Sequence, residues 1–88
     1  MSGFIVSYDL HAQGQNYPCI TGKLKELGAW HMQQSVWLVQ SDLTATQLRD
    51  HLIGCLDSND KLFVAKMTSA AWKTMGQEAD KWIKSIIT

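Results

Sequence analysis

Apolar and polar positions change their spacing several times along the chain, and each change predicts a new element. Residues 4–8 are rich in β-branched and aromatic side chains and lead into a polar stretch closed by a glycine, which predicts a strand followed by a loop. Residues 17–27 carry apolar side chains at intervals of three and four, after a candidate N-cap at Asn16 and before Gly28, which predicts a helix. The chain therefore begins with a strand and a helix.

The middle of the chain repeats this alternation. Residues 29–40 switch to a period of two that is interrupted at residues 33–35, so they form either one bent strand or two short strands. Thr44 and Gln47 have the spacing of a capping box and predict the start of a second helix, which ends near residues 58–59. The expected apolar stripe of this helix is Leu48, Leu52, Ile53 and Leu56.

The last third of the chain predicts one more strand and a terminal helix. Residues 62–65 form the strand, and residues 70–75 are either a short strand or coil. After Gly76 the spacing becomes helical again, so residues 76–88 are expected to form an amphipathic helix. Its apolar stripe contains Trp82, Ile83 and Ile86. This stripe either covers an open face of the sheet or forms an interface with a second subunit.

The order of these elements favours a small α+β layer sandwich. With 88 residues the chain accommodates a single domain, residues 1–88, with a small hydrophobic core. Burial in so small a core offsets the entropy of ordering the chain only narrowly. A second subunit would therefore add stability.

Composition and charge narrow the classes of function. Hydrophobic residues make up 45% of the chain and charged residues 18%, which favours a folded domain over a disordered segment. The formal net charge is zero, so the domain lacks the basic character of a typical duplex-binding protein. Cys19 and Cys55 have no CxxC spacing and predict two buried, reduced thiols. Neither a signal peptide nor a membrane span is recognisable, so we expect a cytoplasmic protein that does not engage a membrane.

Asp9 is the strongest candidate for chemistry, because a carboxylate in the loop after an apolar strand is well placed to hold a divalent metal ion. The alternative is a structural role, in which Asp9 accepts hydrogen bonds from backbone amides of the turn. One carboxylate is too few for a tight Mg²⁺ site, but one from each subunit of a two-fold dimer would supply two. His11 stands two residues further on and is a candidate acid, base or ligand contact.

The other histidines and the tryptophans have more ordinary interpretations. The three histidines are twenty residues apart and form no HxxxH pair, so zinc is not expected. The four tryptophans are able to stack on bases, but Trp37 in an apolar strand and Trp82 in an amphipathic helix favour packing. The chain has no phosphate-binding glycine loop and no nucleophile motif, so nucleophilic catalysis has no support.

Taken together, several short segments resemble the second CRISPR-associated protein family, the small Cas endonuclease and integrase subunit, with its VapD-like and SinR-like relatives. The resemblance spans roughly residues 4–67. The segments that carry it are IVSYDL at 5–10, NY at 16–17, LG at 27–28, QSVW at 34–37, LRDHL at 48–52 and DKLFV at 60–64.

The resemblance implies a ferredoxin-like βαββαβ sandwich, a homodimer, and a role in a defence or mobile-element system. It also implies that Asp9 of each subunit approaches its partner to hold Mg²⁺ or Mn²⁺ for hydrolysis of a phosphodiester, with His11 as a second catalytic candidate. Ser35 would correspond to the serine of a Ser-Val-Phe strand motif that shapes the dimer or the nucleic-acid surface. The candidate residues for binding a ligand or nucleic acid are Tyr8, Gln13, Ser35 and Trp37.

Two features of the sequence depart from this pattern and keep other functions open. The chain is neutral, and glutamines such as Gln13 and Gln33 stand where arginines would serve phosphates better. These departures favour a non-catalytic dimeric module that binds a small nucleotide ligand or a protein partner. A third alternative is a regulatory subunit whose C-terminal stripe docks on a larger enzyme.

Overall fold

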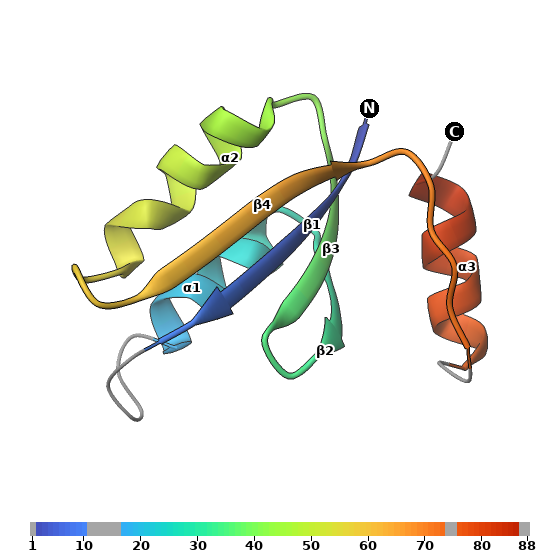
Figure 1. Ribbon diagram of the computed structural model, residues 1–88, viewed down its shortest axis with the longest axis horizontal. Coiled ribbons are helices and arrows are strands. Elements are labelled where there is room, and N and C mark those ends of the chain that lie inside the picture. The colour runs from blue at the N-terminus through green and yellow to red at the C-terminus, as the bar shows by residue number, and fades with distance from the viewer. Residues whose placement is uncertain (1, 11–16, 74–75, 87–88) are drawn as a thin grey trace.

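The computed structural model describes residues 2–10, 17–73 and 76–86, the last residue for its backbone only. The elements are β1 (Ser2–Asp9), α1 (Tyr17–Glu26), β2 (Trp30–Gln33), β3 (Val36–Ser41), α2 (Ala45–Leu52), the short 3₁₀ helix η1 (Ile53–Cys55), β4 (Lys61–Met67) and α3 (Gln77–Ile86). Within these residues, four strands form one antiparallel sheet in the order β2-β3-β1-β4. Strand β1 is therefore central, and β2 and β4 are the two edges (Figure 1).

Helix α1 begins and ends close to where the sequence predicts. Ile20 and Leu24, one turn apart, are fully buried against the sheet. The helix ends in a Schellman arrangement, because the amide of Gly28 donates to Lys25 and the amide of Ala29 donates to Leu24. Gly28 has a φ of 73°, a conformation that a residue with a Cβ adopts only at a cost.

Residues 29–40 form two strands rather than one bent strand. A tight turn joins β2 to β3, and the pairing of the two strands shifts register between His31 and Gln33. The shift is a bulge or irregularity that shortens the regular pairing of β2. Of residues 70–75, for which the sequence left strand or coil open, residues 70–73 contain no strand, and residues 74–75 lie outside the described residues.

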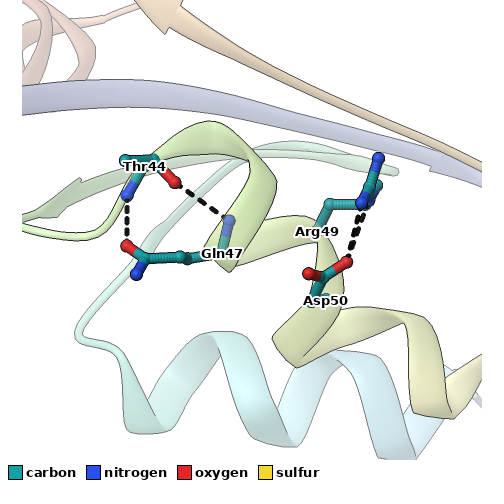
Figure 2. A network of polar contacts seen from close by, with 4 residues as sticks. All are labelled: Thr44, Gln47, Arg49 and Asp50. Carbon is teal, nitrogen blue, oxygen red and sulfur yellow. Dashed lines mark hydrogen bonds and ion pairs between the residues drawn. The ribbon is translucent and has the colours of Figure 1, made fainter.

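Helix α2 is started by the capping box that the sequence predicts (Figure 2). The hydroxyl of Thr44 accepts from the amide of Gln47 at 3.1 Å, and the side chain of Gln47 accepts from the amide of Thr44 at 2.9 Å. Leu48 and Leu52 are fully buried, as expected. The prediction for Ile53 is wrong, because the chain tightens into η1 after Leu52 and leaves Ile53 52% exposed.

The face of the sheet toward α1 and α2 carries the main hydrophobic core. Alternate residues of the strands point to this face, as the period of two requires. Trp37 is 2% exposed, and its indole Nε1 donates to the hydroxyl of Tyr8 at 3.0 Å. The fully or nearly fully buried residues of this core are Phe4, Val6, Tyr8, Leu10, Ile20, Leu24, Trp37, Val39, Leu48, Leu52 and Cys55.

Helix α3 covers part of the opposite face of the sheet, as Figure 1 shows. Ile83 is 3% exposed and packs with Ala79 on Leu38 of β3. Indole rings fasten this helix to the sheet: Trp30 and Trp82 stack with ring centroids 6.1 Å apart, and the Nε1 of Trp30 donates to Glu78 at 3.0 Å. The Nε1 of Trp72 also donates to Asp80 of α3. In the isolated chain, Trp82 and Ile83 of this stripe therefore pack on the sheet.

A disulfide bond joins Cys19 of α1 to Cys55 of η1, so the prediction of two reduced thiols is wrong. The two Cα atoms are 5.6 Å apart, because α1 and the end of α2 lie on the same face of the sheet. The spacing of 36 residues in the sequence gave no hint of this proximity. The bond thus links α1 to the 3₁₀ turn η1 that directly follows α2.

Candidate functional site

Asp9 lies exposed at the end of β1, where the sequence predicts it. Its register partner on β4 is Lys61, which is also exposed. A hollow of about 250 Å³ opens at this end of the two strands, and its wall includes Ser7, Asp9, Lys61 and Phe63. A carboxylate and an ammonium group thus stand on neighbouring strands beside a shallow concavity.

On the face of the sheet that α3 covers, no helix among the described residues covers the end near Asp9. Ser7 of β1 has Val36 of β3 on one side and Phe63 of β4 on the other, and all three side chains point away from the main core. Ser7 and Val36 are half-buried, whereas Phe63 is 62% exposed. We call Ser7, Val36 and Phe63 the bare row. It places apolar surface next to the carboxylate of Asp9.

Tyr8 and Trp37, two of the predicted ligand-binding residues, are part of the core beneath this end of the sheet. Tyr8 is 4% exposed, and its ring lies 6.0 Å from that of Tyr17. Burial raises the pKa of the Tyr8 phenol, although the hydrogen bond from Trp37 acts in the opposite direction. The backbone carbonyl of Ser35 accepts from the amide of Tyr8 at 3.2 Å. Tyr8, Ser35 and Trp37 thus hold the end of β1 from which Asp9 projects.

The structure brings only some of the predicted site residues together. His11 and Gln13 lie outside the described residues, as does the side chain of Ile86. Ile83 is buried between α3 and the sheet, and Trp82 is half-buried against Trp30, both at the covered part of the sheet. The predicted interface residues on α3 are thus separate from the bare row.

The described residues contain no group of three His, Cys, Asp or Glu side chains that could hold a metal ion. Among the described residues that line the hollow, Asp9 offers one carboxylate. Mg²⁺ is commonly bound by one or two protein carboxylates, with water and substrate phosphates as the other ligands. The donor set at Asp9 is therefore compatible with Mg²⁺ or Mn²⁺ when a second chain contributes its own carboxylate.

Phe63 is the site residue that the sequence interpretation missed. It occupies the outward position of β4, between Leu62 and Val64, which pack on the main core. A signal was present, because a period of two that buries Leu62 and Val64 must turn Phe63 to the other face. His31, on the core side of β2, lies on the face opposite Trp30 and Met32, and it stacks on Trp37 with ring centroids 4.2 Å apart.

No known protein-family model matches this chain. Among the described residues, no helix combines the length and apolar character required to cross a lipid bilayer. Any function must accordingly be argued from the site itself.

Proposed function

We propose that the protein is a ferredoxin-like homodimer that hydrolyses phosphodiester bonds with Mg²⁺ or Mn²⁺ held by Asp9 of both subunits. The observation that carries the proposal is the bare row beside the exposed carboxylate. The antiparallel strand order β2-β3-β1-β4, with α1 and α2 on one face, supports the ferredoxin-like assignment. A two-fold contact through the bare row would bring the two copies of Asp9 toward each other.

Phe63 supplies much of the energy for such a contact. Its exposed fraction of 62% corresponds to roughly 120 Å², taking about 200 Å² for the whole side chain. At ~25 cal/mol per Å², burial of this surface contributes about 3 kcal/mol from each subunit. The half-buried Val36 adds further apolar surface. We therefore place the centre of the proposed interface at this row.

The residues near Asp9 define what the chain itself would do in the reaction. The metal would supply an activated water and would neutralise charge on the scissile phosphate. Asp9 would fix the position of the metal, and the ammonium group of Lys61, opposite Asp9 on β4, would attract the phosphodiester backbone. Tyr8, held by Trp37, would keep the end of β1 rigid.

Cleavage assays on single-stranded RNA, single-stranded DNA and duplex DNA with Mg²⁺ or Mn²⁺ test the proposal. We expect wild-type activity that a chelator removes and that Asp9→Asn abolishes, while light scattering still gives twice the 9.9 kDa mass of one chain. The matched control is Asp50→Asn, which removes an exposed carboxylate on α2 and should retain activity.

The variant Phe63→Ser tests whether cleavage depends on formation of the dimer. It should shift the protein toward monomers and lower cleavage in parallel, with activity returning at high protein concentration. A wild-type protein that is monomeric at micromolar concentration would refute the shared site. A folded dimer without activity on any of these substrates would refute the hydrolase.

A second candidate is a non-catalytic dimeric module that binds a small nucleotide or a protein partner. It is favoured by the formal net charge of zero, which gives a long polyanion little general attraction. Calorimetric titration with mononucleotides and dinucleotides, on the same preparation used for cleavage, distinguishes the two. The binding module would be established if the dimer cleaves no substrate but binds a nucleotide, and if this binding is lost when the bare row is altered.

The proposed location is the cytoplasm, and the disulfide provides a direct test of it. Disulfide bonds persist in oxidising compartments and are rare in the reducing cytosol. Thiols are alkylated in intact cells before lysis, and the mass of the protein is then measured. Alkylation of both Cys19 and Cys55 would support the cytoplasm, whereas an intact bond would contradict it.

A further inference from the structure

The two edges of the sheet differ in their suitability for pairing with another strand. Strand β2 has four residues and an irregular register with its neighbour. Strand β4 has seven residues, and its pairing with β1 runs without a shift from Lys61 to Met67. No proline interrupts β4. As the outermost strand, β4 directs a row of backbone hydrogen-bonding groups away from β1, which another extended chain can satisfy.

Two hollows lie beside β4 on the face that carries α2. One, of about 230 Å³, is walled by Leu62 and Val64 of β4 and by Ala45 and Arg49 of α2. The other, of about 320 Å³, also includes Ala45 and extends to Lys66. Side chains on one face of an added strand recur about every 7 Å. The side chains of such a strand opposite Leu62 and Val64 would therefore lie at the first hollow, and the side chain opposite Lys66 would lie at the second.

The charges of β4 indicate the chemistry of the added strand. The charged residues of β4 are Lys61 and Lys66, both exposed and on opposite faces of the sheet. Charged side chains, lysine above all, protect sheet edges from pairing with one another. A second copy of β4 would bring the same two lysines and no carboxylate, so it is a poor complement. A strand with carboxylates at the positions opposite Lys61 and Lys66 complements the charge of β4.

We propose that the outer edge of β4 docks an extended, acidic segment of another protein as an additional antiparallel strand. Its apolar side chains lie at the hollow walled by Leu62 and Val64, and its two carboxylates, five residues apart, face Lys66 and Lys61. This docking shares Lys61 with the proposed hydrolase, but it uses the outer edge of β4 and needs neither Asp9 nor a metal.

The test uses a fluorescein-labelled peptide with the core Glu-Thr-Val-Thr-Val-Glu, in which antiparallel pairing places the valines opposite Val64 and Leu62, at the first hollow. The matched control peptide has lysine in place of both glutamates. We expect saturable binding to the wild-type protein in fluorescence anisotropy, with the glutamate peptide bound roughly tenfold more tightly than the lysine peptide. The variant carrying both Lys61→Glu and Lys66→Glu should prefer the lysine peptide.

Amide chemical shifts from ¹⁵N-labelled protein locate the bound peptide. Changes that centre on residues 61–67 support the proposal. Absence of saturable binding up to millimolar peptide, shifts centred elsewhere, or a preference that the double variant does not reverse would overturn it. Without peptide, slower hydrogen exchange of the β4 amides at higher protein concentration would also overturn the proposal, because a second copy of the chain would then occupy the edge.

Discussion

Reduction of the Cys19–Cys55 disulfide should remove a large part of the stability of this domain. The bond closes a loop with a sequence separation of 36 residues. In the chain-entropy treatment, opening such a loop adds about 13 cal/mol/K to the entropy of the unfolded chain, or ~4 kcal/mol at 25 °C. A domain of this size is stable by only about 4 to 13 kcal/mol, so the reduced protein would be marginally folded.

Guanidinium chloride unfolding, followed by circular dichroism with and without dithiothreitol, measures this effect. With a denaturant slope of about 2 kcal/mol/M, the midpoint of the reduced protein should be lower by roughly 2 M. Cys19→Ser should behave like the reduced wild-type protein, because Cys19 is the exposed partner and its replacement leaves the core unchanged. The reasoning fails if thiol titration shows complete reduction and the midpoint moves by less than about 0.3 M.

Three further changes have defined consequences. Thr44→Ala should lower the free energy of unfolding by about 1 kcal/mol through loss of the capping box, whereas Thr44→Ser should be nearly neutral in the same denaturation experiment. The pKa of Tyr8 is raised above its ordinary value of 10.0. The stability that the neutral phenol adds to the folded state is therefore complete below that pH and is lost as the pH rises through the folded-state pKa. The stability difference between the wild type and Tyr8→Phe should therefore shrink in unfolding curves above pH 10 and stay constant between pH 7 and 9. Ile83→Ala should speed hydrogen exchange of the α3 amides by at least tenfold while leaving β1 amides protected, and equal acceleration in both would show that α3 does not open separately.

The sequence predicted those elements whose local signals agree with their tertiary contacts. Helix α1 combines the apolar spacing of Ile20 and Leu24 with a glycine that ends it, so periodicity and backbone preference indicate the same boundaries. The capping box of Thr44 is equally local. The extent of α2 was overestimated because the apolar character of Ile53 continues the helical stripe, although the backbone tightens into a 3₁₀ turn there.

The features that the sequence missed depend on contacts between distant segments. Pairing of Cys19 with Cys55 requires α1 and η1 to share one face of the sheet, and residue spacing carries no such information. The placement of α3 was left open between the sheet and a second subunit, because an apolar stripe does not specify what it covers. At the candidate site, Asp9 was found from its position after a strand. The exposed position of Phe63 follows only from the packing of Leu62 and Val64 on the main core.

The stacked rings of Trp30 and Trp82 give the protein a built-in optical reporter. The indole planes lie within 15° of each other, and one ring belongs to β2 while the other belongs to α3. Two identical chromophores this close couple their electronic transitions, and the coupling disappears when the rings separate. Far-ultraviolet circular dichroism of the unlabelled protein can thus follow the departure of α3 from the sheet separately from the unfolding of the sheet itself.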